Sequence, residues 1–219
     1  MINMNIQMNK LILTAGALLL VLSAAVSPRP LNAQTVEEVV ASVESHYGDL
    51  TDLTAKVIQK NVLKSIGKTQ TFEGTLWIKK PGKLRIEYSN GQLIIINNKA
   101  ALFYSKKSEQ VVKKTFTDFE RLNIPVAFLL GAAHIRDDFD VLQADPKTPR
   151  VLDLLPRKSG AAMKKMGLVL DAAGRITELT IFDRSGNTTT LAFSDIREDA
   201  GLDDRRFVFQ APKGTEIIE

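Results

Sequence analysis

Short runs of alternating apolar and polar residues cover most of the chain, and polar turns separate them. A period of two places every second side chain on one face of a strand, so each run predicts a strand with one buried face. The turns recur roughly every eight to twelve residues, the spacing of an antiparallel meander. The chain is therefore predicted to be mainly β, with about ten or eleven strands. Clear examples are residues 53–63, 84–88, 110–115 and 176–183, and the last predicted strand is 206–209.

A helical pattern precedes the first strand. Thr35 and Glu38 have the spacing of a capping box, in which each side chain bonds the backbone N–H of the other residue. Valines and Tyr47 then repeat at helical spacing and form one apolar stripe. An amphipathic helix is expected here, ending near Gly48.

A second helix is predicted where the alternation breaks, between residues 118 and 133. The apolar positions are too continuous there for an exposed loop. Pro125 is suited to begin a helix and Gly131 to end it. We expect a short helix that is buried on one side.

The segment from Gly74 to Tyr88 is the clearest local motif. Two β-prone runs flank residues 80–83, which read Lys-Pro-Gly-Lys. Proline fixes φ and glycine supplies the positive φ of a tight turn, so this segment predicts a hairpin. Arg85 lies inside the second strand, where a guanidinium is tolerated only if it faces water or reaches several acceptors.

The fold class follows from the number of strands. A large antiparallel sheet must curl to protect its edges and one apolar face, and the helices could then cover the concave side. Several strands are apolar on both faces, for example residues 93–96, 102–104 and 168–170. Either a packed core or a hollow that admits acyl chains would explain this pattern, and the sequence leaves both open.

The N-terminus has the layout of a secretory signal peptide. A polar, basic-only start ends at Lys10, an apolar run covers residues 11–26, and the prolines at 28 and 30 are followed by Ala33, a small residue suited to a cleavage site. We expect residues 1–33 to be a signal peptide cleaved after Ala33, and residues 34–219 to be a single exported domain. An uncleaved N-terminal anchor is the alternative.

Composition excludes several kinds of site. The chain has no cysteine, so it has no disulfide framework, thiolate metal site or cysteine nucleophile. Removal of residues 1–33 would take away Lys10 and Arg29 and lower the formal net charge from +4 to +2, which is too small and too evenly spread to argue for binding nucleic acid. Lysine pairs fall mostly at predicted strand ends or turns, which favours solvated edges over a binding patch. They are residues 79–80, 106–107, 113–114 and 164–165.

The sequence lacks recognisable catalytic patterns. His46 and His134 lie on different predicted helices, and neither has a second ligand or an orienting carboxylate at a useful spacing. The adjacent aspartates at 137–138 and 203–204 do not face one another as an acid and base pair would. We expect no enzyme activity, no cofactor and no metal.

Three segments together resemble the LolA family, the periplasmic carriers of outer-membrane lipoproteins. The strongest is Gly74-x-Leu-Trp-(aliphatic)-Lys-(basic)-Pro, with Arg85 four residues after the proline. The second is 47–59, which is similar to a short helix followed by a Leu-x-Ala-x-Phe-x-Gln strand, with Val57 in place of phenylalanine. The third is 207–216, which is similar to the closing Phe-x-Phe-x-x-Pro-x-Gly of the family.

This resemblance implies an incomplete antiparallel β-barrel with a helical lid over an apolar cavity. It also implies that Arg85 is a latch whose donors hold lid backbone groups when the cavity is empty. The lid would include the helix around Pro125. The candidate cavity and lid residues are Trp77, Ile86, Ile95, Phe103, Pro125, Phe128 and Leu129.

The implied partners follow from the same resemblance. A monomeric carrier would take acylated lipoproteins from an inner-membrane releasing transporter complex and pass them to an outer-membrane receptor lipoprotein. Two alternatives remain open: a carrier of another envelope lipid, and an envelope sensor or interaction domain that uses the same half-barrel.

Overall fold

In the computed structural model of the chain, Ala33–Glu219 form one compact unit, and the fold described below is that of this unit. The structure describes residues 34–97, 100–115, 128–131, 134–145, 147–148, 150–157 and 163–219. In these residues, no helix is long and apolar enough to cross a membrane.

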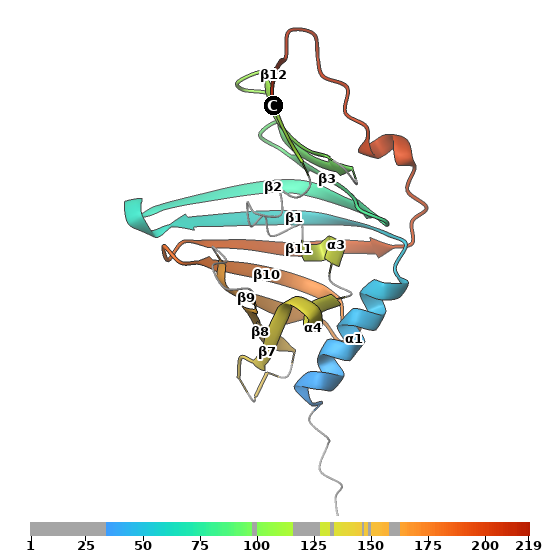
Figure 1. Cartoon of the computed structure of the whole chain (residues 1–219), viewed down its shortest axis with the longest axis vertical. Helices are drawn as coiled ribbons and strands as arrows, with labels where there is room; N and C mark the ends of the chain where they lie inside the picture. Colours follow the sequence, from blue (N-terminus) through green and yellow to red (C-terminus); the bar gives the residue numbers. More distant parts are fainter. Residues whose placement is uncertain are drawn as a thin grey trace, which may run out of the picture. The chain divides into compact units, whose positions relative to one another are not determined.

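One sheet of twelve strands forms the framework of this unit (Figure 1). Its strands are β1 (Asp52–Leu63), β2 (Lys68–Lys79), β3 (Lys83–Tyr88), β4 (Gln92–Asn97), β5 (Ala100–Ser105), β6 (Gln110–Thr115), β7 (Phe139–Gln143), β8 (Val151–Pro156), β9 (Met163–Leu170), β10 (Ile176–Asp183), β11 (Thr188–Glu198) and β12 (Glu216–Ile218). Their spatial order is β12-β6-β5-β4-β3-β2-β1-β11-β10-β9-β8-β7.

The sheet consists of two antiparallel meanders joined by the long-range pairing of β1 with β11. β12 pairs with β6 in parallel, and all other neighbours are antiparallel. β12 and β7 are the two outer strands, so the described sheet is open and does not close on itself. The predicted fold class, a mainly β and incomplete antiparallel barrel, is confirmed.

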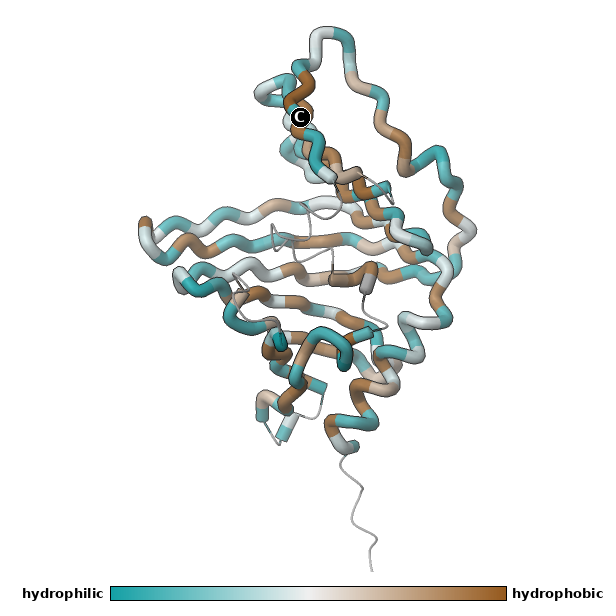
Figure 2. The backbone as a smooth tube through the Cα atoms, in the orientation of Figure 1, coloured by the Kyte–Doolittle hydropathy of each residue, from teal (hydrophilic) through white to brown (hydrophobic). Residues whose placement is uncertain are grey.

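The predicted hairpin consists of β2 and β3. Gly82 has a φ of 62°, as the turn requires. Gly74 is needed for a different reason: a Cβ atom there would lie 2.5 Å from the carbonyl oxygen of Glu87 on β3. The motif glycine therefore allows the two backbones to approach. Figure 2 shows hydrophobic and hydrophilic residues alternating along the strands that flank this hairpin.

The helices lie on one face of the sheet (Figure 1). They are α1 (Val36–Asp49), α3 (Phe128–Gly131) and α4 (Ile135–Asp138). The described residues also contain two 3₁₀ turns, η1 (Lys64–Ile66) and η4 (Asp204–Phe207), and η4 contacts β3 and β4 from the opposite face. Both hydrogen bonds of the predicted capping box of α1 are present, from the Thr35 N–H to the Glu38 carboxylate and from the Glu38 N–H to the Thr35 hydroxyl. α3 ends at Gly131, as predicted, while residues 116–127 lie outside the described residues.

The sequence prediction of a last strand at residues 206–209 is wrong. Residues 206–209 are not a strand, because the Asp203 side chain accepts a hydrogen bond from the Arg205 N–H and caps the 3₁₀ turn η4. The last strand is instead β12. It has only three residues, too few for an alternating pattern to predict a strand, and it forms by pairing with β6.

Candidate functional site

The register of β2 and β3 divides their side chains between two faces. Leu76 lies opposite Ile86, and both are fully buried on the face that the helices cover. Trp77 lies opposite Arg85, on the other face. We call these the helix face and the strap face. The strap is residues 200–219, the segment that follows β11.

The helix face near α1 is closely packed. Tyr47 of α1, Leu129 of α3 and the inward residues of β1, β2, β10 and β11 surround a cavity of only about 10 Å³. That is about the space of one water molecule. The Tyr47 hydroxyl accepts the N–H of Ile176 at 3.1 Å, and burial raises the pKa of Tyr47 to about 12. This part of the helix face is therefore a core with no room for a ligand.

Farther from α1, toward the turn between β1 and β2, the same face opens into a pocket of about 450 Å³. We call it the outer pocket. This volume is within the range of small-molecule sites, about 300–1,000 Å³. Its described lining residues are Gln59, Asn61, Gln70, Phe72, Tyr88, Gln92, Leu93, Ile94, Phe103, Tyr104, Ser105, Ser108, Gln110 and Val112.

A chain of hydrogen bonds orders one wall of the outer pocket. The Tyr88 hydroxyl donates to the Gln59 side-chain oxygen, and the Gln59 amide donates to Asn61 Oδ1 at 3.0 Å. Burial raises the pKa of Tyr88, so its hydroxyl stays protonated and acts as a donor. The Tyr88 ring packs edge-on against Phe72 at a centroid distance of 6.0 Å. Polar and aromatic groups are thus fixed side by side in this wall.

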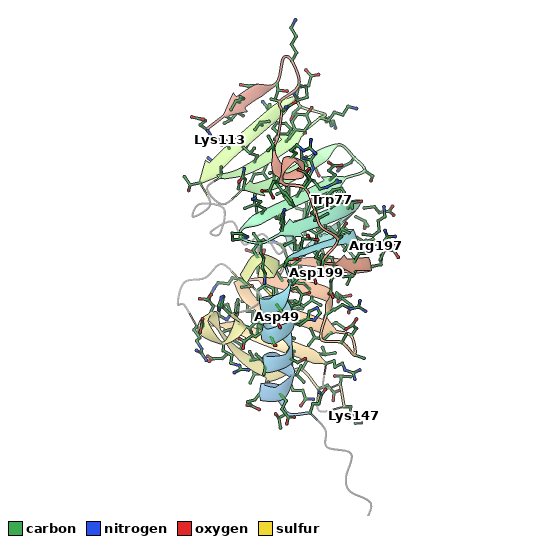
Figure 3. The ribbon with its side chains drawn as sticks, turned by 90° about the vertical axis from the view of Figure 1, so that its right-hand side faces the viewer. Asp49, Trp77, Lys113, Lys147, Arg197 and Asp199 are labelled. Atoms are coloured by element: carbon green, nitrogen blue, oxygen red, sulfur yellow. The ribbon has the colours of Figure 1, made fainter. Side chains whose placement is uncertain are left out.

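The C-terminal segment covers the part of the strap face that the hairpin forms. At the start of the strap, the N–H groups of Ala200 and Leu202 donate to the buried carboxylate of Asp52 on β1, at 2.8 and 2.9 Å. Nearby, Asp199 accepts both the N–H and the hydroxyl of Thr51, at the junction of α1 and β1 (Figure 3).

Cations of the hairpin then hold the strap along β2 and β3. Lys79 and Lys83 each lie 2.8 Å from the carboxylate of Asp204, and these hydrogen bonds lower the pKa of Asp204. Arg85 donates to the Arg206 carbonyl at 2.8 Å and pairs with Glu87 at 2.5 Å. Lys79 and Lys83 therefore bind the strap, so Lys79 is not the solvated edge residue that its pair with Lys80 predicted.

Aromatic groups complete the attachment. The Arg206 guanidinium lies 4.8 Å from the Trp77 ring centroid, and Trp77 is labelled on β2 in Figure 3. Phe207 is buried, and the Phe209 ring packs on Tyr104 at 5.2 Å. A half-open cavity of about 400 Å³ remains beside this contact. It is lined by Ile95, Asn97, Ala100, Leu102, Lys113, Phe207, Val208 and Phe209.

The residues nominated from the sequence are divided between these surroundings. Ile86 and Leu129 belong to the packed core, and Phe128 packs against it with its ring 5.9 Å from that of Phe139. Phe103 lines the outer pocket.

The other nominated residues lie elsewhere. Trp77, Ile95 and Arg85 are on the strap face, and Pro125 lies outside the described residues. The latch role of Arg85 stays a prediction; its described partners are Arg206 and Glu87.

Two features of the site were missed by sequence reasoning. One is the set of amides that line the outer pocket, such as Gln59 and Gln70, which alternation places on the same face as the buried residues of their strands but whose polarity favours contact with water. Lys80, before the turn proline, donates to the Gly48 carbonyl at 3.3 Å near the end of α1. Desolvation lowers the pKa of Lys80. The position of Lys80 in the hairpin motif indicated that it could be important. Its contact with Gly48 could not be predicted, because the two residues are distant in sequence.

Metal-ligating side chains do not converge in the part of the chain that the structure describes. No group of three or more His, Asp or Glu side chains among these residues could hold a metal ion. His46 instead contacts Glu198 at 2.8 Å and ties α1 to β11.

Comparisons with known proteins agree with this architecture. The family model described as "Outer membrane lipoprotein carrier protein LolA" matches residues 49–210. A protein of Cupriavidus pinatubonensis named outer-membrane lipoprotein carrier protein is 27% identical over 217 residues, which cover 97% of this chain and 100% of the relative. One of the same name from Chromobacterium violaceum is 28% identical over 211 residues, covering 94% and 95%.

A solved structure shares the fold. A conserved protein from Thermus thermophilus superimposes with a TM-score of 0.51 at 15% identity, over 84% of this chain and 99% of that one.

Proposed function

The chain belongs to the LolA family of outer-membrane lipoprotein carrier proteins, and on this premise we propose that it carries acylated lipoproteins across the periplasm. The observation that carries the proposal is the outer pocket of about 450 Å³ on the helix face, where the described residues near α1 leave a cavity of only about 10 Å³.

The pocket suits acyl chains because of its floor. Ile94, Phe103 and Val112 lie opposite one another on β4, β5 and β6, and Phe72 closes the side toward β1. Each methylene that moves from water onto such a surface contributes about 0.8 kcal/mol. A chain of ordinary length could thus be held firmly by this surface without any charged contact.

A carrier must also release its cargo. Ordering side chains and moving covering segments on binding both cost free energy, and these costs keep the affinity moderate. The predicted lid between residues 118 and 133, of which α3 is described, would supply such a cost. The cargo would come from an inner-membrane releasing transporter complex and go to an outer-membrane receptor lipoprotein, with the carrier acting as a monomer exported by a cleaved signal peptide.

The test is to identify what the protein carries. The full chain is purified from the periplasm of its own host and analysed by native mass spectrometry followed by lipid extraction. A bound acylated lipoprotein is the expected result. Free lipid without protein would replace the proposal with a carrier of another envelope lipid, and neither would favour a sensor or interaction domain.

A matched pair of variants locates the cargo. Ile94→Glu places a charge on the pocket floor, while Ile58→Glu makes the same change on the exposed strap side of β1. Burying an unpaired carboxylate is strongly unfavourable, so Ile94→Glu should lose cargo and Ile58→Glu should retain it. Equal cargo in both variants would exclude the outer pocket as the binding site.

A further inference from the structure

The outer pocket has no charged residue among the described residues that line it. All fourteen of them are neutral, whereas 25% of the whole chain is charged. Lys106 and Lys107, in the adjacent turn between β5 and β6, are not among the lining residues. The polar groups that face the pocket are carboxamides and hydroxyls.

These neutral groups are arranged in a row. Gln92, Ser105 and Gln110 lie opposite one another on β4, β5 and β6. The next row toward α1 on the same face, two residues along each strand, is the apolar floor at Ile94. On the other side of the pocket Asn61 lies opposite Gln70. Along the strands the helix face therefore changes from packed core to apolar floor to neutral polar rim.

An apolar floor beside a neutral polar rim matches a ligand in which a hydrocarbon chain is joined to an uncharged polar group. A carboxamide offers two N–H donors and a carbonyl acceptor, so it can bind the carbonyl and N–H groups of esters and amides. Gln59 uses one donor and its oxygen within the wall, which leaves it a second N–H and a second lone pair. The rim can therefore hydrogen-bond a neutral polar group attached to a hydrocarbon chain on the floor.

The rim is poorly suited to an anion. A phosphate taken out of water needs cationic or multiple directed donors, because an unpaired buried charge is costly. At the edge of the pocket, the Gln110 amide donates to the carboxylate of Glu216 at 2.8 Å. This carboxylate places a negative charge beside the rim. An anionic headgroup would meet repulsion there.

We propose that the outer pocket binds the uncharged ester or amide junction between an acyl chain and a polypeptide, and that its neutral rim discriminates against phospholipids with an anionic phosphate. This inference rests on the proposed function and adds the property by which an acylated polypeptide is selected over the lipids of the membrane it leaves.

The test compares two probes with the same hydrocarbon chain. One is an N-palmitoylated, C-terminally amidated peptide of uncharged residues, and the other is 1-palmitoyl lysophosphatidylglycerol. Binding to the delipidated full chain is measured by calorimetry with both probes monomeric. We expect the acyl peptide to bind at least about tenfold more tightly, because the phosphate finds no cation on the rim and forgoes one charge-assisted hydrogen bond.

Three lysine variants test where this selectivity resides. Gln70→Lys and Gln92→Lys each place a cation on the rim, the first at a half-buried and the second at an exposed position. Thr71→Lys adds the same charge to the next residue of β2, which faces the opposite side of the sheet. The rim variants should bind the lysophospholipid about tenfold more tightly than the wild type, and Thr71→Lys should not.

The outcomes separate the inference from the function. Equal affinity of the wild type for both probes, or an equal gain in rim and control variants, would overturn the inference while leaving lipoprotein carriage intact. Failure to bind either probe would count against the proposed function itself. Because Gln92 is exposed, its variant keeps the test decisive if Gln70→Lys does not fold.

Discussion

Replacing Arg85 by methionine should loosen the strap without weakening acyl-chain binding. The change removes the hydrogen bond to the Arg206 carbonyl, which joins atoms 2.8 Å apart, and the ion pair with Glu87. A hydrogen bond from a charged group contributes about 1.5–3 kcal/mol. The ion pair adds less than about 1 kcal/mol because 47% of the Glu87 side chain is exposed.

The free energy that holds the strap on the hairpin should therefore fall by about 2–3 kcal/mol. This lowers the ratio of attached to detached strap roughly 30- to 150-fold. The chain has one tryptophan, and that residue is Trp77, whose ring lies 4.8 Å from the Arg206 guanidinium. Its fluorescence reports directly on the strap. In a urea titration the Trp77 signal of Arg85→Met should change at a lower concentration than that of the wild type, while the far-ultraviolet circular dichroism midpoint moves less.

Glu87→Gln is the matched control, because it weakens the ion pair but leaves the bond from Arg85 to the strap. It should shift the Trp77 transition only slightly. The reasoning would be refuted if Arg85→Met left the Trp77 transition unchanged but altered the affinity for the palmitoylated peptide. That result would support the lid-latch role that the family resemblance implies for Arg85.

Three further predictions concern the core and the strap. Ile86→Ala, at a fully buried position, should lower the free energy of unfolding by about 2–5 kcal/mol in denaturant titration, whereas Ile58→Ala, at a 47% exposed position, should have little effect. Tyr47→Phe should cost about 1–3 kcal/mol by the same measurement, because it leaves the buried N–H of Ile176 without its acceptor; an unchanged midpoint would contradict this. The folded-state pKa of Asp204 is lowered, so its contribution is present above the unfolded value of about 3.9 and is lost as the pH falls through the folded value. The fluorescence of the sole tryptophan should accordingly change with acidification below about pH 3.9, and Asp204→Asn should reduce that change.

Much of the fold was predictable because its signals are local. The Thr35 capping box forms between residues three positions apart, and the turn at Gly82 depends on its own φ. The hairpin predicted around the Lys-Pro-Gly-Lys turn is formed by β2 and β3, although it places the nominated residues Trp77 and Ile86 on opposite faces. The strand predicted at 206–209 failed because a side-chain cap at Asp203 outweighed a weak alternating pattern.

The candidate site was less predictable because it depends on distant pairs. Phe103 was nominated from its apolar strand and does line the outer pocket. Gln59 and Gln70 were not, since an amide on a strand has the same pattern whether it faces bulk water or a pocket. Their role became visible only when pairing across β1 and β2 placed them beside Phe72 and Tyr88.

By itself the sequence determined which side chains share a face, because the geometry of an extended chain fixes their alternation. Only the tertiary structure decided what covers each face. Helices α1 and α3 came to one side and the strap to the other, through contacts such as that of Arg85 with Arg206, 121 residues apart. No local pattern encodes such a contact, because its free energy depends on every element that brings the two segments together.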